Sequence, residues 1–414
     1  MTTAGLEIYA VGGAVRDRLL GLPVHEHDWV VVGASPEAMT ERGFEPVGRE
    51  FPVFLHPRTH EEYALARTER KTGPGYHGFT VHADPSVSLE ADLGRRDLTI
   101  NAMAQAADGT LIDPFQGRDD LNAGLLRHVS DAFREDPVRI LRLARFAARL
   151  EPLGFRVAAE TLALCREMVA NGEVEALVPE RVWQETAKAL MAPAPGEYIR
   201  VLRECGALAV LMPEVDCLFG IPQPADHHPE VDTGDHILRV LAQAVRLDAD
   251  LATRFSALVH DLGKGVTPTE QLPGHRGHEA RGVPLVKALC ERLRVPAACR
   301  DLALGVTRYH LDCHRVQALA ADDVLALLEG LDLFRRPERL DPFLLACEAD
   351  YRGRKGLEDR PYPQAEWLRT ALAGCREVDA SAYVEAGYRG PAIGAAVRQA
   401  RVEAITRLQA ASRR

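Results

Sequence analysis

The sequence predicts an α+β fold in which an N-terminal part with a mixed sheet and helices precedes a long, all-helical part. Short β-rich runs bounded by glycine occur at residues 6–11 (LEIYAV) and 29–32 (WVVV). From about Asp136 the strand signals nearly vanish, and Ala, Leu, Arg and Glu dominate long stretches. The length of 414 residues corresponds to two or three ordinary domains.

In the N-terminal part the pattern predicts a strand, a helix at 13–20 and a second strand. A hairpin is expected from residues 51–55 and 62–66, which flank a turn with the sequence HPRTHE. Glycine and proline predict a mobile loop at 70–78 and a turn-rich segment at 112–120.

The remainder is predicted to be helical. Residues 136–150 (DPVRILRLARFAARL) and 180–191 (ERVWQETAKALM) carry apolar side chains at helical spacing. The Pro-rich stretch 221–229 (IPQPADHHP) resembles a linker into a further helical module. No repeat of fixed period interrupts this pattern.

Composition excludes several classes of protein. Eight cysteines without a CxxC spacing favour a reduced, intracellular protein. Neither a signal peptide nor a long apolar span is visible, so we expect a cytoplasmic protein without a membrane partner. The formal net charge of −10 argues against a nucleic-acid partner when it is taken alone. Binding requires only a local basic stripe, however, and the predicted helix that follows Asp136 offers one.

The first candidate site begins where a predicted strand meets Gly12 and Gly13. Free amides at a helix start can cradle an anion, and Arg16 lies one turn further. A plain strand–helix turn is the alternative. Glu26 and Asp28 have i, i+2 spacing in a predicted strand, which places both carboxylates on one face. That pair suits two Mg²⁺ ions of a phosphoryl-transfer site, and a solvated acidic turn is the alternative.

Arginines form two further clusters. Arg95, Arg96, Asp97 and Asn101 lie together in RRDLTINA, where a helix start with exposed charges is the alternative. At 100° per residue, one face of the helix after Asp136 gathers Arg139, Arg142, Arg145 and Arg149. Few acidic partners lie at i±4 on that helix, so an external anion is at least as good a partner as solvent.

Four motifs in this order, GGAVRD, acid-x-acid, RRDLTINA and EDPVRILRLARF, resemble the bacterial CCA-adding enzymes, class II tRNA nucleotidyltransferases of the polymerase-β-like superfamily. The resemblance covers residues 6–190 most strongly. It implies a polymerase-β-like head that adds CCA to the tRNA 3′ end from CTP and ATP, with Mg²⁺ as cofactor. It also implies nucleotide binding by a set of eight residues, namely Gly13, Arg16, Arg96, Asn101, Asp136, Arg139, Arg142 and Arg145.

Within that resemblance, Glu26 and Asp28 are implied as the catalytic metal ligands. The family usually has Asp at the first position, and Glu is one methylene longer, so Asp28 is the safer ligand. Asp97 and Glu62 are both candidates for a third carboxylate. Asp136 and Arg139 are implied to read the base edges, since a carboxylate accepts from the exocyclic amine that both C and A carry.

The second candidate site centres on HDLGK at 260–264. With His236 upstream, this segment resembles the HD phosphohydrolase superfamily. The resemblance implies a metal site from His236, His260 and Asp261, which His310 would complete, with Asp312 and Asp350 as alternatives. Nitrogen ligands favour Ni²⁺, Co²⁺ or Mn²⁺ over Mg²⁺. The implied activity is hydrolysis of phosphomonoesters, 2′-nucleotides and 2′,3′-cyclic phosphates.

Taken together, we expect a nucleotidyltransferase head at 1–135, a helical neck and body for base selection and tRNA contact at 136–225, an HD domain at 226–335 and a helical tail at 336–414. A monomer or a homodimer is expected. Two alternative functions remain: a poly(A) polymerase of the same class, and an HD-type regulator with an inactive head. An acidic, HD-bearing C-terminal part disfavours the first, and the complete motif set disfavours the second.

Overall fold

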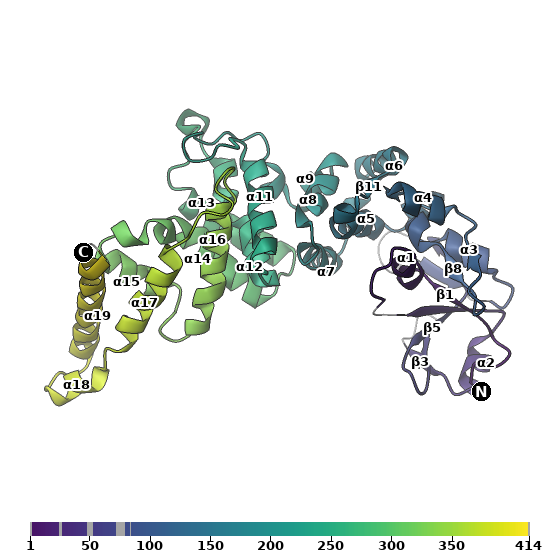
Figure 1. The fold of residues 1–414 in the computed structure, drawn as a ribbon, viewed down its shortest axis with the longest axis horizontal. Helices are drawn as coiled ribbons and strands as arrows, with labels where there is room; N and C mark the ends of the chain where they lie inside the picture. The colour runs from purple at the N-terminus through teal and green to yellow at the C-terminus, as the bar shows by residue number, and fades with distance from the viewer. Residues whose placement is uncertain (1, 25–26, 48–52, 72–78, 83, 413–414) are drawn as a thin grey trace. The chain divides into compact units, whose positions relative to one another are not determined.

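The computed structural model describes the chain except residues 1, 25–26, 48–52, 72–78, 83 and 413–414. The chain divides into two compact units, Met1–Leu211 and Met212–Arg414. In Figure 1 the first unit runs from purple to teal and the second from teal to yellow. The first contains a mixed sheet and the second is built from helices, so the predicted α+β class is confirmed.

The sheet of the first unit has the strand order β3-β4-β5-β2-β1-β8-β9. Strands β2 and β5 are parallel, and the other neighbours are antiparallel. The strands of this unit are β1 (Glu7–Val11), β2 (Asp28–Val32), β3 (Glu45–Val47), β4 (Val53–Leu55), β5 (Glu62–Leu65), β6 (Thr68–Lys71), β7 (Phe79–His82), β8 (Ala104–Gln105), β9 (Leu111–Ile112), β10 (Leu125–Leu126) and β11 (Arg156–Val157).

Apolar side chains alternate along β1, β2 and β5, so each face of the sheet has its own core. One face buries Val11, Val30 and Ala66, and the other buries Val31, Tyr63 and Leu65. The helices of this unit are α1 (Gly13–Leu19), α2 (Pro36–Glu41), α3 (Leu89–Gly94), η1 (Thr99–Asn101), α4 (Gly117–Ala123), α5 (Val138–Leu150), α6 (Ala159–Ala170), α7 (Pro179–Leu190), α8 (Pro195–Glu204) and α9 (Ala207–Leu211).

Two local predictions in the first unit were wrong. Arg70 and Lys71, expected in a loop, end strand β6, which pairs with β7; residues 72–78 lie outside the described residues. Residues 117–120, expected as turns, begin helix α4. The physical reason is a side-chain cap, because Asp113 accepts from the backbone N–H groups of Gly117 (2.7 Å) and Arg118 (2.9 Å).

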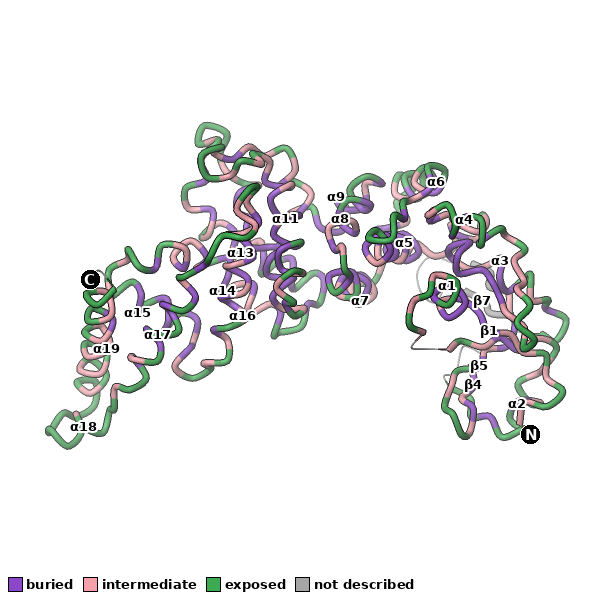
Figure 2. The backbone as a smooth tube through the Cα atoms, viewed as in Figure 1, coloured by how far each residue is buried: buried purple, intermediate pink, exposed green. Residues whose placement is uncertain are grey.

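The second unit packs α14 against α12, α13 and α16, and α11 against α12 and α16. Its helices are α10 (Pro213–Asp216), α11 (Thr233–Arg246), α12 (Leu251–Val259), η5 (Leu262–Val266), α13 (His278–Arg292), α14 (Ala297–His314), α15 (Ala321–Gly330), α16 (Leu340–Arg352), α17 (Gln364–Arg376), α18 (Ala380–Glu385) and α19 (Pro391–Ser412). Figure 2 shows α11 largely buried, α14 with buried and partly buried residues, and α18 exposed.

The Pro-rich segment at 221–229 is not the linker that its composition suggested. Gln223 is 2% exposed, and the segment closes on itself through a β-bridge between Pro222 and Asp232. Composition alone cannot reveal this, because the buried contacts of the segment are made with residues far along the chain.

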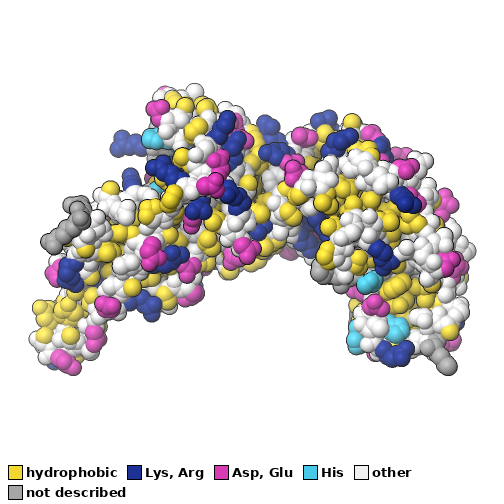
Figure 3. All heavy atoms as spheres, in the orientation of Figure 1, with side chains coloured by type: hydrophobic (Ala, Val, Ile, Leu, Met, Phe, Trp, Pro, Cys, Tyr) yellow, Lys and Arg dark blue, Asp and Glu magenta, His cyan; other side chains and the backbone are white. Residues whose placement is uncertain are grey.

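Basic and acidic side chains are interspersed on the face of the protein seen in Figure 3. On this face, therefore, neither sign of charge forms one continuous surface.

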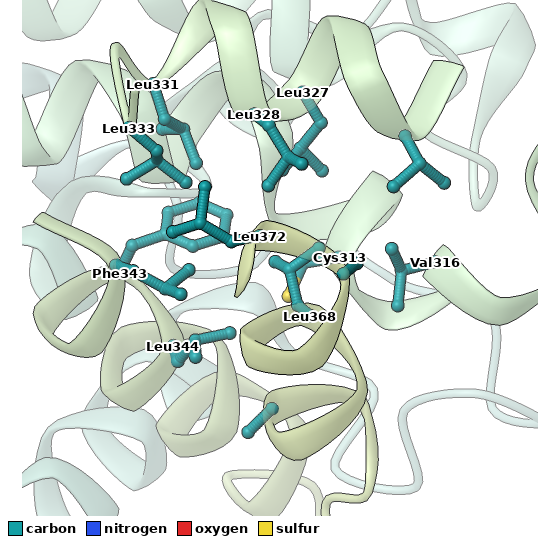
Figure 4. Packing of buried hydrophobic residues seen from close by; sticks show 14 of the residues in the cluster. Cys313, Val316, Leu327, Leu328, Leu331, Leu333, Phe343, Leu344, Leu368 and Leu372 are labelled. Carbon is teal, nitrogen blue, oxygen red and sulfur yellow. The ribbon is translucent and has the colours of Figure 1, made fainter. Parts of the chain in front are cut away.

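A large apolar cluster in the second unit joins α14 to the C-terminal helices. Figure 4 shows the side chains of Cys313, Leu328, Phe343, Leu344 and Leu368 gathered in this cluster. Ile405 of α19 is also fully buried in this cluster. The burial of side chains from α14, α15, α16, α17 and α19 fixes α14 and α16, two helices that carry residues of the second candidate site.

Candidate functional site

The turn from β1 into α1 brings three predicted residues together. Gly12 has φ 68°, a conformation that glycine adopts without strain. A Cβ at this position would lie 3.0 Å from Arg96 Nη1 and 3.9 Å from Asp28 Oδ2. Arg96 and Asp28 therefore meet beside Gly12, immediately before Gly13 begins α1. This arrangement brings together a guanidinium, a carboxylate and the N-terminal amides of a helix.

Arg16 lies beneath that turn in a buried polar network. Its side chain is 2% exposed and donates to Asp17 (2.8 Å) and to Asn101 Oδ1 (2.6 Å). Asn101 in turn donates to Asp97 Oδ1 at 3.0 Å. Burial lowers the pKa of Arg16, although Asp17 opposes this shift. The structure therefore brings Arg16 and Asn101 together as hydrogen-bond partners beneath the glycine turn.

Asp97 is held at the end of this network by Arg142 of α5, which donates from Nε (2.8 Å) and Nη2 (2.7 Å). Burial alone would raise the pKa of Asp97, but Arg142 and Asn101 lower it to about 2. Asp97 is consequently an ionised partner of arginine.

Asp28 and Glu62 are direct register neighbours on the parallel strands β2 and β5. Paired residues on adjacent strands project to one face, about 4.8 Å apart at the backbone. Both are exposed. Of the two candidates for a third carboxylate, Glu62 is the one beside Asp28. Glu26 lies outside the described residues.

The arginine face of α5 meets carboxylates from other elements. Arg142 contacts Asp97, Arg145 contacts Glu185 at 2.5 Å, and Arg149 contacts Asp17 at 2.8 Å. The scarcity of acidic partners on α5 itself was a correct observation. Spacing along one helix could not reveal partners contributed by α1, α7 and the segment after α3.

At the start of α5, Asp136 and Arg139 have separate partners. Asp136 accepts from Val138 N (3.0 Å) and Arg181 Nη2 (3.3 Å). Arg139 donates to the backbone carbonyls of Ala132 (2.7 Å) and Arg95 (2.6 Å). Sequence reasoning missed Arg181, which lies 45 residues from Asp136, and no local signal marks it.

The second candidate site lies inside the helical unit, where His236, His260 and Asp350 form a fully buried group. His236 Nε2 is 3.0 Å and His260 Nε2 is 3.6 Å from Asp350 Oδ1. Asp261 Oδ2 lies 3.2 Å from His260 Nε2. Asp350, one of the two alternatives to His310, is therefore the residue beside His236 and His260.

His310 belongs to a second group that shares the same aspartate. Asp261 Oδ1 lies 3.1 Å from His278 Nε2 and 3.7 Å from His310 Nε2. The two imidazole nitrogens are 3.3 Å apart. Asp261 thus stands between two sets of ligand-type atoms, one on each carboxylate oxygen. His278 was named in no predicted ligand set.

These atoms have the chemistry of a metal site. Among the described residues, His260 Nε2 and both oxygens of Asp261 are buried without a hydrogen bond of good geometry, and the Lys264 ammonium, 2.7 Å from Asp261 Oδ2, is the cation already beside them. Burial would lower the pKa of His260, but Asp261 and Asp350 raise it to about 10. Burial lowers the pKa of His310 well below its usual value. A divalent ion would satisfy these imidazoles and carboxylates together.

Three family models match the chain. The poly A polymerase head domain matches residues 8–127, a probable RNA and SrmB-binding site of polymerase A matches 154–218, and the HD domain matches 233–344. None of the helices in the described part of the chain combines the length and apolar character that crossing a bilayer requires.

Similar proteins span the whole chain. The multifunctional CCA protein of Alkalilimnicola ehrlichii is 66% identical over 98% of both chains, and that of Thioalkalivibrio sulfidiphilus is 64% identical over 98% of this chain and 99% of its own. The crystal structure of the Bacillus stearothermophilus CCA-adding enzyme in complex with CTP has a TM-score of 0.65 at 25% identity, over 97% of this chain and 89% of its own. The chain belongs to the family of multifunctional CCA proteins.

Proposed function

We propose that the chain adds CCA to the 3′ end of tRNA, with CTP and ATP as substrates. The observation that carries this proposal is the meeting of Asp28 and Arg96 at Gly12, directly before the amides of α1. Amides and a guanidinium suit a triphosphate, and a carboxylate suits its metal ion. The relatives named multifunctional CCA protein and the similar structure with bound CTP support the same substrates.

For the metal, Glu26 and Asp28 would hold Mg²⁺, and we assign Glu62 as the third carboxylate because of its register beside Asp28. Mg²⁺ bound there supplies activation of the tRNA 3′-hydroxyl and charge neutralisation at the leaving pyrophosphate. Asp97 is assigned a different role: its ion pair with Arg142 keeps RRDLTINA against α5.

For the nucleotide, the Gly13 amide and the side chains of Arg16, Arg96 and Asn101 would orient the triphosphate and sugar. Asp136 and Arg139 would hydrogen-bond the base edge, which requires Arg139 to exchange its carbonyl partners for the base. Arg142 and Arg145 would bind phosphate after a similar exchange of their carboxylate partners. U and G lack an amine at the matching position and would leave buried groups unpaired.

The tRNA would contact a basic surface beside this site. Arg145, Arg149 and Lys188 line a cavity of about 490 Å³ in the first unit. Positive side chains around such a hollow attract the phosphates of an RNA end, with an affinity that falls as salt rises. Because its substrate is tRNA, we infer that the protein acts in the cytoplasm, as a monomer or a homodimer. The division into head, neck and body, HD domain and tail remains part of this proposal.

The HD unit would carry a separate phosphohydrolase activity toward phosphomonoesters, 2′-nucleotides and 2′,3′-cyclic phosphates. His236, His260, Asp261 and Asp350 would hold one Ni²⁺, Co²⁺ or Mn²⁺ ion, and Asp261, His278 and His310 would hold a second. A transition metal bound there polarises the phosphoryl oxygens and lowers the pKa of its water. Lys264, 2.7 Å from Asp261 Oδ2, orients this shared aspartate.

The test of nucleotide addition uses a tRNA that lacks its CCA end. With Mg²⁺ and CTP alone, the proposal predicts two added C residues, and with CTP and ATP together it predicts a single terminal A after them. Long A tracts from ATP would indicate the poly(A) polymerase alternative instead. An absence of any transfer would indicate the regulator with an inactive head.

A further inference from the structure

The segment between α10 and α11, residues 221–232, forms one wall of the second candidate site. Gln223 N donates to Val231 O at 2.7 Å, and the Gln223 side chain accepts from Lys264 Nζ at 2.6 Å. Pro222 O lies 2.9 Å from His275 Nε2. Pro222 and Gln223 therefore attach the base of the segment to His275 and Lys264, beside that site.

Glu230 is the acidic residue that this wall buries. The Glu230 side chain is 0% exposed, and Oε1 lies 2.9 Å from His236 Nδ1 and 3.0 Å from His228 Nδ1. Its other oxygen accepts from Lys355 N at 3.2 Å. The Nδ1 atoms of both imidazoles therefore converge on the same carboxylate oxygen.

A carboxylate accepts hydrogen bonds from the N–H groups of neighbouring imidazoles. His228 Nδ1 lies in hydrogen-bond contact with Glu230 Oε1 at 3.0 Å. Among the described residues His236 Nδ1 makes no hydrogen bond of good geometry, and Glu230 Oε1, 2.9 Å away, is the carboxylate oxygen placed to accept a proton from it. A proton on Nδ1 directs the lone pair of Nε2 toward Asp350 Oδ1, 3.0 Å away.

Two acceptors at that distance require a cation between them. The other ring nitrogens of His260, His278 and His310 face neutral backbone carbonyls, namely those of Ala257 (2.9 Å), His275 (2.9 Å) and Val306 (3.0 Å). Of these outer nitrogens, His236 Nδ1 has the nearest carboxylate, Glu230 at 2.9 Å, whereas Glu279 Oε2 lies 3.5 Å from His278 Nδ1. A carboxylate behind a ligand histidine fixes the tautomer and raises its basicity toward the metal.

The backbone beside Glu230 supports a functional reason for this geometry. Val231 has φ 61°, which is rare and costly for a β-branched residue. Hydrogen bonds from Gln223 N to Val231 O (2.7 Å) and from Val231 N to His228 O (2.9 Å) maintain that conformation. Strained residues that the surroundings hold in place occur preferentially at functional sites.

We propose that Glu230 is a positioning residue that holds His236 with its proton on Nδ1 and its Nε2 lone pair directed at the metal position shared with His260 and Asp350. The inference rests on the proposed metal site of the HD unit. It assigns a role to a residue that lies outside every predicted ligand set.

The experiment measures Co²⁺ binding to the full-length protein by titration, with the d–d absorption bands as a report on coordination. Glu230→Gln removes the charge at nearly constant volume. We expect roughly 10- to 100-fold weaker Co²⁺ binding at the position shared by His236, His260 and Asp350, since the loss of a carboxylate behind a ligand histidine has this effect. Asp226→Asn, an exposed residue of the same segment, should bind as the wild type does. Nucleotide addition should be unchanged in both variants.

A second variant separates positioning from misfolding. Glu230→Asp keeps the charge but withdraws it by one methylene, so we expect binding between that of the wild type and Glu230→Gln, with an unchanged melting temperature in the absence of metal. If Glu230→Gln binds Co²⁺ with wild-type affinity, the positioning role is wrong, while the proposed metal site is unaffected. A wild-type protein that binds no Co²⁺ at all would overturn the proposed metal site itself.

Discussion

Asp97 and Arg142 form a two-point ion pair, Nε and Nη2 of the arginine lying 2.8 and 2.7 Å from the same carboxylate oxygen. Through Asn101 and Arg16 this pair is continuous with the glycine turn at Gly12. Three motifs that lie far apart in the sequence are thereby joined in one buried network. The position of Arg16 beneath the glycine turn therefore depends on Asp97, which it reaches through Asn101.

We predict that Asp97→Asn destabilises the first unit at pH 7 by roughly 2 kcal/mol, the free energy that corresponds to lowering a pKa from 3.8 to about 2. Because the folded-state pKa is depressed, this stabilisation is present above about pH 4 and is lost as pH falls through 2. Differential scanning calorimetry across this range measures it. Asp119→Asn, on the exposed surface of α4, is the control and should melt as the wild type does. A stability difference that does not shrink on acidification would contradict the assignment.

Gly12→Ala is expected to impair nucleotide binding beyond its effect on stability. The positive φ costs an alanine about 1–2 kcal/mol, and the added Cβ would also displace Arg96 Nη1, which lies 3.0 Å away. We expect the KM for CTP to rise. Gly21→Ala is a matched control, because Gly21 has the same φ of +68° but no heavy atom within 4 Å of its Cβ position. Equal KM values in the two variants would exclude a role of the close approach.

Glu62→Gln is predicted to slow nucleotide addition strongly if Glu62 shares a metal ion with Asp28. The loss should be partly restored by raising the Mg²⁺ concentration, because the variant weakens binding of the ion without removing Asp28. Glu61→Gln provides the comparison, since Glu61 accepts from Thr59 at 2.9 Å and precedes the strand. Normal rates of nucleotide addition in Glu62→Gln would show that Glu62 is not the third carboxylate and that another acidic residue supplies it.

In the helical unit, Asp350→Asn and His310→Ala are predicted to remove different ions. Asp350 lies with His236 and His260, whereas His310 lies with His278 and Asp261. Each variant should therefore bind one equivalent of Co²⁺ fewer than the wild type, and Asp261→Asn should lose both. Equilibrium dialysis with metal analysis counts the ions. A wild-type stoichiometry of one, unaffected by His310→Ala, would contradict the second position.

Local chemistry was sufficient to predict much of this arrangement. The glycine turn into α1 follows from two adjacent residues, and the adjacent pair His260–Asp261 marks the second site. Contacts between segments far apart in the sequence could not be predicted from local chemistry. Asp350 lies 114 residues from His236 and meets it only because α11 and α16 pack together.

Glu230 is a second residue whose contacts could not be predicted from the sequence around it. Its segment has the composition of a linker, and only the folded structure reveals that this segment closes over His236. Likewise, the arginine face of α5 was identified correctly, but its carboxylate partners come from Asp17, Asp97 and Glu185 on other elements. Spacing within one helix contains no information about such partners.

The central claim, that two separate sites carry two activities, is tested most directly by measuring both activities in Asp28→Ala and His260→Ala. We predict that Asp28→Ala loses addition of CCA to a truncated tRNA and retains hydrolysis of a 2′,3′-cyclic nucleotide. His260→Ala should retain addition and lose hydrolysis. Nucleotide addition at the normal rate by Asp28→Ala, or loss of both activities in either variant, would contradict the account.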